Sequence, residues 1–259
     1  MHFQGKYAVG SQHHSKLHIY DDSRAEVQVV SATETNAYPG TKMHRTMVMI
    51  KDENFEKAFL LDIMKVDTNA KQDYDLPYYF LGQVIDTNFD YASPSTLAPL
   101  GSKNGYQHLY LEGQGQPKTD NTKLSWLTEG KFFTLTAATN TSDELLFTRM
   151  GAKDPEFNIR REAAFMIRRN DTADTTFATV IEPHGSYSAV TEASLNSSSN
   201  IANLAIVYDD EQYTAIQITD LSGNVQLFIL VNQDAVASSK HSLKIADTTY
   251  DWTGVFYYQ

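Results

Sequence analysis

Short stretches of alternating apolar and polar residues recur along the whole chain and set the strongest limit on its fold. Gly, Pro, Asn, Asp and Ser separate each stretch from the next. Because successive side chains of a strand point to opposite faces, runs of about 4–8 residues bounded by turn formers are typical of antiparallel strands. The clearest runs are residues 26–30, 43–50, 58–66, 131–135, 145–147, 176–181, 202–208, 213–218, 225–231, 242–245 and 252–258.

Helical periodicity is not sustained anywhere. Residues 155–169 are the one ambiguous segment, because Phe157, Arg161 and Phe165 fit helical spacing while Phe165 and Ile167 alternate. We interpret it as a strand. The sequence therefore predicts an all-β chain with little or no helix, a large antiparallel β-sandwich of roughly fifteen strands that forms a single domain over residues 1–259.

Charge and composition exclude several kinds of function. The 259 residues include 21 Lys and Arg against 32 Asp and Glu and no Cys, a formal net charge of -11. An acidic balance without a block of Lys and Arg disfavours general nucleic-acid or anionic-membrane binding, which normally needs a clustered positive surface, and leaves room for local basic sites. Disulfides, thiolate metal sites and a Cys nucleophile are excluded. We find no run of about 18 apolar residues, so no membrane span is expected, and no export signal at the start.

Histidines are concentrated near the start of the chain, where four of the eight occur: His2, His13, His14 and His18. With His44, Asp21 and Asp22 they offer the imidazole and carboxylate ligands that zinc prefers. A polar edge strand explains the same residues. His13 and His14 are adjacent, so in a strand at most one of them faces a given site.

Two other segments combine residue types suited to catalysis or sugar binding. Tyr38 begins a Pro-Gly turn, and His44 and Arg45 follow it, so a phenol, an imidazole and a guanidinium come from one turn. An anchoring aromatic ring is the simpler explanation. Tyr106, His108 and Tyr110 are two residues apart and lie on one face if extended, which suits stacking on a sugar ring or an ordinary half-buried strand.

Two further features have a structural as well as a functional interpretation. His184 lies where a predicted strand meets a turn. Arg160, Arg161, Arg168 and Arg169 form the densest positive cluster, which we interpret as a solvated face paired with nearby acids rather than an anion site. The sequence has no GxSxG, Walker A, GxGxxG or HExxH motif.

Several ordered motifs at consistent spacing resemble the C-terminal heparinase II/III-like domain of alginate lyases of polysaccharide lyase family 17. They run along most of the chain: NAYPG (36–40) with MHRT (43–46), YDLPYY (74–79), LGS (100–102) with GYQHLY (105–110), MGA (150–152) with NIRR (158–161), and IEPHGSY (181–187). Members of that family have an α/α toroid followed by a β-sandwich, and they cleave alginate oligomers, typically from an end, by β-elimination. This chain resembles the sandwich alone.

The resemblance implies a role for each candidate residue. It assigns Tyr38 to the catalytic cleft and His44 to the cleft or to a zinc ion. It also implies a structural zinc site, for which the remaining candidates are His13, His14 and Asp21. The residues expected to bind substrate are Arg45, Tyr106, His108 and His184. The family's other catalytic groups lie in the toroid, which is absent here, so the chain alone is expected to be inactive or nearly so.

Three functions follow from these features. The first is the C-terminal half of an alginate lyase that forms one wall of the cleft, with the missing toroid and a uronate oligosaccharide as partners. The second is a non-catalytic uronate-binding sandwich, and the third a sandwich that only docks another domain. From the substrate class we expect a periplasmic or secreted bacterial protein.

Overall fold

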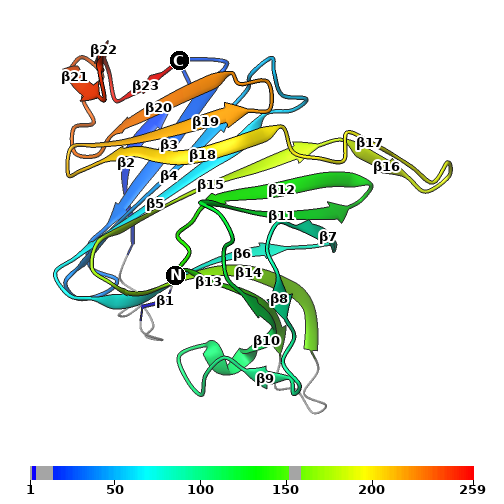
Figure 1. The fold of residues 1–259 in the computed structure, drawn as a ribbon. Helices are drawn as coiled ribbons and strands as arrows, with labels where there is room; N and C mark the ends of the chain where they lie inside the picture. The colour runs from blue at the N-terminus through cyan, green and yellow to red at the C-terminus, as the bar shows by residue number, and fades with distance from the viewer. Residues whose placement is uncertain (1, 4–13, 152–158) are drawn as a thin grey trace.

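The computed structural model describes residues 2–3, 14–151 and 159–259, and it confirms the predicted all-β fold (Figure 1). The described residues form strands β1 to β23 and one short 3-10 helix, η1 (Tyr106–His108). All strand pairs in this part of the chain are antiparallel. The strands outnumber the expected fifteen because several have only two or three residues.

Most of the chain lies in three sheets, of which the largest is in the middle. This larger sheet has the order β2 (Lys16–Asp21), β3 (Val27–Glu34), β4 (Thr41–Ile50), β5 (Phe59–Thr68), β15 (Thr175–His184), β12 (Lys131–Ala138), β11 (Asn121–Thr128) and β7 (Gln83–Thr87). The second sheet has the order β1 (His2–Phe3), β6 (Gln72–Phe80), β14 (Ile159–Thr172), β13 (Glu144–Gly151), β10 (Leu109–Gly115) and β8 (Tyr91–Ala92), and β9 (Ala98–Pro99) also pairs with β10.

The small sheet and two hairpins complete the described fold. The small sheet has the order β18 (Ile201–Asp209), β19 (Tyr213–Asp220), β20 (Val225–Val231) and β23 (Phe256–Tyr258). The hairpins are β16 (Ser186–Ser188) with β17 (Ala193–Leu195), and β21 (Lys240–Ile245) with β22 (Thr248–Thr253). Figure 1 shows the small sheet, in yellow and orange, at one end of the molecule and the second sheet, in green, at the other.

The larger sheet buries apolar side chains on both faces, and strand alternation explains how. On β5, Leu61 and Ile63 point into a first core shared with the small sheet. Met64 and Val66 point into a second core shared with the second sheet. Since alternate side chains point to opposite faces, one strand serves both cores.

The segment with ambiguous periodicity is a strand, as predicted. In β14, Phe165 and Ile167 face the second core, and Met166 faces a smaller cluster with Tyr106 and Leu109 on the outer side of the second sheet. A helix could not divide neighbouring residues between two opposite faces in this way.

The interpretation of the arginine cluster as a solvated face is wrong for its two members whose side chains are described. Arg168 binds Asp75 through Nε and Nη2, at 2.7 and 2.9 Å. Arg169 is buried, and its Nε lies 3.3 Å from both carboxylate oxygens of the buried Asp143. The sequence neighbours are not the partners because the antiparallel sheet brings distant residues closer.

Arg169 also ties the two large sheets together. From β14 of the second sheet its guanidinium donates to Thr176 O at 2.7 Å and to Ala138 O at 3.1 Å, both in the larger sheet. The guanidinium also lies 4.1 Å from the ring centroid of Phe177. No helix in the described residues is long and apolar enough to cross a membrane.

Replacing Arg169 is expected to destabilise the fold strongly. Arg169→Met leaves Asp143 charged and buried without its partner, which costs about 3–5 kcal/mol in comparable pairs. The matched control is Lys71→Met, because Lys71 pairs with Asp171 at 2.8 Å on the surface, and exposed pairs contribute about 0–1 kcal/mol. Urea unfolding of both variants measures the difference. If both variants lose the same free energy of unfolding, Arg169 does not stabilise the contact between the two sheets.

Candidate functional site

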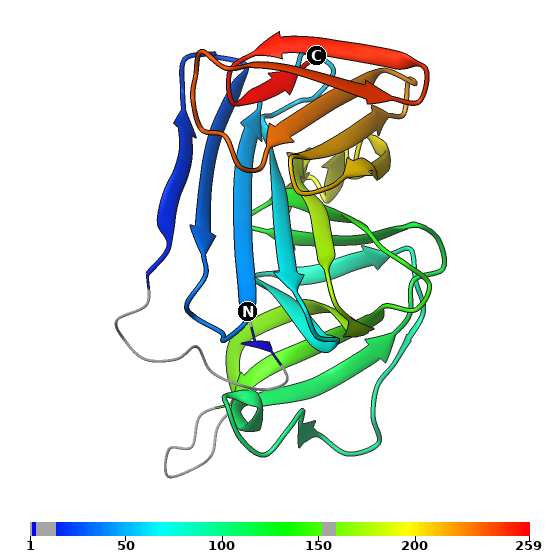
Figure 2. The ribbon, with the colours of Figure 1, turned by 90° about the vertical axis from the view of Figure 1, so that its left-hand side faces the viewer.

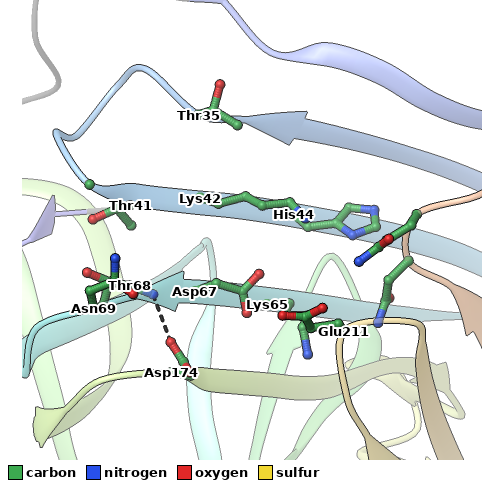
Figure 3. Close-up of a pocket in the computed structure, with 13 residues that line it drawn as sticks. Thr35, Thr41, Lys42, His44, Lys65, Asp67, Thr68, Asn69, Asp174 and Glu211 are labelled. Atoms are coloured by element: carbon green, nitrogen blue, oxygen red, sulfur yellow. Dashed lines mark hydrogen bonds between the residues drawn. The ribbon is translucent and has the colours of Figure 1, made fainter.

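A polar cleft of about 490 Å³ opens where the ends of β4 and β5 meet the small sheet (Figure 3). Its residues come from strands of the larger sheet and the turns next to them, and from the segments that precede β19 and follow β20. They are Thr35, Gly40, Thr41, Lys42, His44, Lys65, Asp67, Thr68, Asn69, Asp174, Glu211, Asn232 and Gln233. The first core ends here, and the face of the larger sheet that contributes to this core changes from apolar to charged.

Strand register brings the charged residues of the cleft together. Lys42 is directly opposite Asp67, and His44 is directly opposite Lys65, on the paired strands β4 and β5. Directly opposite residues of an antiparallel pair point to the same face. Figure 3 accordingly shows Lys42 and His44 on one strand, with Asp67 on the next.

His44 is the most deeply buried ionisable group of the cleft. It is 2% exposed, its Nε2 lies 2.5 Å from Ser31 Oγ, and the His18 ring contacts it edge-on at 4.8 Å between centroids. Burial lowers the pKa of His44 to about 3, and the nearby His18, Lys42 and Lys65 act in the same direction. His44 is therefore a neutral imidazole at neutral pH.

The two lysines of the cleft differ in their partners. Lys65 donates to Asp209 Oδ1 at 2.7 Å, across the gap to the small sheet. Lys42 has no ion pair or hydrogen bond within the described part of the chain, although its charge acts on both His44 and Asp67. Lys42 is thus the cation that can bind an incoming carboxylate.

Two further groups can act on a ligand in the cleft. Burial raises the pKa of the Asp67 carboxyl above its ordinary value, against the opposing effect of Lys65 and Lys42. A raised pKa allows a carboxyl group to carry a proton closer to neutrality. The Thr41 hydroxyl is buried and, among the residues described, has no hydrogen-bond partner. A ligand can supply the missing bond.

The predicted zinc ligands do not form a metal site in the described residues. His13 lies outside them. His14 is exposed before β2, and Asp21 accepts hydrogen bonds from Ser23 N and Oγ at the far end of that strand. No group of three His, Asp or Glu side chains positioned to hold a metal occurs in the described ranges. The zinc site stays a prediction, because part of its proposed ligand set lies outside the described residues, and we derive no step from zinc.

The structure does not gather Tyr38, His44 and Arg45 around one turn. The turn itself forms, with Thr41 N donating to Tyr38 O at 3.1 Å. However, Tyr38 is buried in the second core, on the other side of the larger sheet from His44. Arg45 shares that other side and binds Asp62 through two hydrogen bonds of 2.9 and 2.8 Å. Burial raises the pKa of the Tyr38 phenol.

Tyr106, His108 and Tyr110 do not share one face, because the extended course on which that arrangement depended does not form. Gly105 adopts a left-handed conformation with φ of 93°, and residues 106–108 then form η1 rather than a strand. Tyr106 is buried and donates to Asp75, Tyr110 is buried in β10, and His108 is exposed. The glycine permits this turn because it has no Cβ.

His184 lies at the end of β15, as predicted, but away from the cleft. It is buried, with Nε2 2.8 Å from Thr134 Oγ1 and Nδ1 2.8 Å from Asn196 O. The cleft instead contains Lys42, Lys65 and Asp67, which sequence reasoning missed. Their signal was present, since Lys42 and His44, like Lys65 and Asp67, are two residues apart in predicted strands.

Two curated proteins are similar to almost the whole chain. An alginate lyase from Stenotrophomonas maltophilia (strain K279a) is 32% identical over 254 residues, which cover 98% of this chain and 34% of that protein. An exo-oligoalginate lyase from Saccharophagus degradans is 27% identical over 258 residues, with the same coverage. The chain thus spans about a third of the length of these relatives, and the predicted resemblance is confirmed. No protein-family model matches the chain.

Solved structures support the fold. The heparan sulfate lyase HepC from Pedobacter heparinus superposes with a TM-score of 0.50 at 11% identity, covering 88% of this chain and 29% of that one. A heparinase III structure also gives 0.50 at 11% identity, over 84% of this chain and 27% of that one. At such identity the likeness shows the fold alone, a heparinase-like β-sandwich.

Acid is expected to destabilise the protein partly through His44. In the unfolded chain this imidazole binds a proton when the pH falls below its ordinary pKa of 6.5. In the folded protein its pKa is about 3. The stability that neutral His44 contributes is therefore complete above about pH 6.5 and lost as the pH falls toward 3. Between pH 7.5 and pH 5 the free energy of unfolding of the native protein should fall by about 2 kcal/mol more than that of the His44→Gln variant, measured by urea unfolding.

The exposed His108 provides the control for this measurement. His108→Gln should leave the pH dependence of stability as it is in the native chain. If His44→Gln leaves it unchanged as well, His44 is not held neutral by burial.

Proposed function

Because this chain is homologous along 98% of its length to about a third of two alginate lyases, we propose that it is the β-sandwich part of a polysaccharide lyase that cleaves alginate oligomers by β-elimination. In this proposal it forms one wall of the active-site cleft. The two-thirds of the relatives that it does not match corresponds to the other wall. The homology along the whole chain is the observation that carries the proposal.

The reaction sets three chemical requirements. A donor neutralises the uronate carboxylate so that the C5 proton becomes acidic, a base removes that proton, and an acid protonates the departing glycosidic oxygen. Within the cleft, the ammonium group of Lys42 is placed to meet a carboxylate, since it has no partner in the described residues. Neutral His44 can donate or accept a hydrogen bond without adding charge.

The cleft residues make an incomplete set for this reaction. The Tyr38 phenol points into the second core and its pKa is raised, so it is not poised as a base in this arrangement. Burial raises the pKa of Asp67, which is the direction that makes a carboxyl group a better proton donor to a leaving oxygen near neutrality. A base that faces C5 therefore comes from the other wall, and the isolated chain is expected to be inert.

Lyase activity should require both parts. The experiment replaces the matched third of the Stenotrophomonas maltophilia alginate lyase with this chain and follows new unsaturated uronate ends by ultraviolet absorbance. The chain alone and the unmatched part alone should give no product, and the chimera should give product. Restoring the lyase's own matched third is the positive control.

Two outcomes would contradict the proposal. If the lyase's own third restores activity and this chain does not, the chain is not a lyase wall. Binding of oligo-alginate by such an inactive chimera would support the alternative, a non-catalytic uronate-binding sandwich. Product from the chain alone would place a complete catalytic set within its 259 residues.

Loss of the Lys42 charge should impair the active chimera. Lys42→Met removes a charge-assisted hydrogen bond to the uronate, which is worth about 1.5–3 kcal/mol. The value of kcat/KM for alginate oligomers should therefore fall about 10- to 100-fold. Lys118→Met is the matched control, because Lys118 pairs with Asp90 in an exposed loop away from the cleft. If both substitutions lower kcat/KM equally, Lys42 does not bind the uronate.

A further inference from the structure

Asp209 joins the small sheet to the larger sheet beside the cleft. It is the last residue of β18, and its Oδ1 accepts hydrogen bonds from Thr214 Oγ1 of β19 and from Lys65 Nζ of β5, both at 2.7 Å. Its Oδ2 accepts a third from Thr176 Oγ1 of β15 at 2.6 Å. In Figure 2 the orange strands of the small sheet lie next to the cyan strand β5 of the larger sheet. Three donors from three strands therefore fix the position of this carboxylate.

Cross-strand register gives Lys65 two partners within reach. Lys65 is directly opposite Thr176 on one neighbouring strand and directly opposite His44 on the other. Directly opposite residues point to the same face, so Lys65 and Thr176 present neighbouring donors to the two oxygens of Asp209. Lys65 also lines the cleft. Its ammonium group can therefore serve Asp209 or a ligand in the cleft.

Burial favours Asp209 as the partner of Lys65. The Lys65 side chain is 11% exposed and that of Asp209 27%, and separating a pair with little access to water leaves two poorly solvated charges. Thr176 and Thr214 are buried as well, so their hydroxyl groups depend on the same carboxylate as their acceptor. Lys65 is therefore expected to stay with Asp209 when a ligand enters.

Lys42 is then the cation of the cleft that a ligand can use. It has no ion pair or hydrogen bond within the part of the chain that the structure describes. The acidic residues that line the cleft are Asp67, Asp174 and Glu211. A ligand with two neighbouring carboxylates would meet one free ammonium group and several like charges, which repel its second carboxylate.

We propose that Asp209 is a positioning residue, which limits the cleft to one uronate carboxylate by holding Lys65 away from the ligand. Lys42 binds the carboxylate of one sugar ring, and the carboxylate of the adjoining ring has no ammonium partner. Lys42 and Lys65 are diagonal neighbours on β4 and β5, about 7–8 Å apart. A freed Lys65 would therefore reach the adjoining ring. The proposal rests on the proposed function for the uronate ligand, and not for the catalytic step.

Calorimetric titration of the 259-residue chain with a saturated alginate disaccharide, which carries two carboxylates, tests the proposal. Asp209→Asn keeps the shape of the side chain and its capacity to bond with the two threonines, but it releases Lys65. The Kd for the disaccharide should fall about tenfold, because the second carboxylate gains a charge-assisted hydrogen bond. For the uronate monomer, which has one carboxylate, Kd should change by less than about twofold.

The double variant shows whether Asp209 acts through Lys65. Asp209→Asn with Lys65→Met has no net charge at this pair, as in the native chain, so Kd for the disaccharide should return to within about twofold of the native value. Asp90→Asn is the matched control, because it releases Lys118 from an exposed pair of 2.7 Å and changes the net charge equally. It should leave Kd unchanged. Because the expected change is a gain of affinity, partial unfolding of a variant cannot produce it.

Several results would overturn the role of Asp209. They are an unchanged or higher Kd in Asp209→Asn, an equal gain for monomer and disaccharide, an equal gain in Asp90→Asn, and a gain that persists in the double variant. Absence of binding by both the native chain and Asp209→Asn would overturn it too.

The two proposals fail separately, because this titration measures binding by the chain alone and needs no catalysis. An inactive chimera together with the expected change in Kd contradicts the lyase function and leaves the role of Asp209 in place. An active chimera together with no effect of Asp209→Asn on Kd contradicts the role of Asp209 alone.

Discussion

Burial of both faces of one sheet is the constraint on which the rest of this structure depends. In β5, Leu61 and Ile63 serve the first core while Met64 and Val66 serve the second. A strand that is solvated on neither side cannot slip by one residue without exchanging the contents of two cores. This fixed register determines which side chains meet at the ends of the strands.

The cleft is a direct consequence of that register. The face of β5 that carries Ile63 into the first core continues to Lys65 and Asp67 once the small sheet no longer covers it. β4 follows the same course from the buried Thr46 to His44 and Lys42. Charged residues therefore collect on the rim of an apolar interface, where a low dielectric strengthens their effect on one another.

Local pattern predicted the strands, the Pro-Gly turn and the fold class, because alternation and turn chemistry are properties of neighbouring residues. It could not predict which strands pair, and so it missed that Lys42 faces Asp67 across β4 and β5. The same limit applies to Arg169, whose partners lie in three other segments. It also considered only an extended course for Tyr106 to Tyr110, because Gly105 was not recognised as a left-handed residue that starts a 3-10 turn.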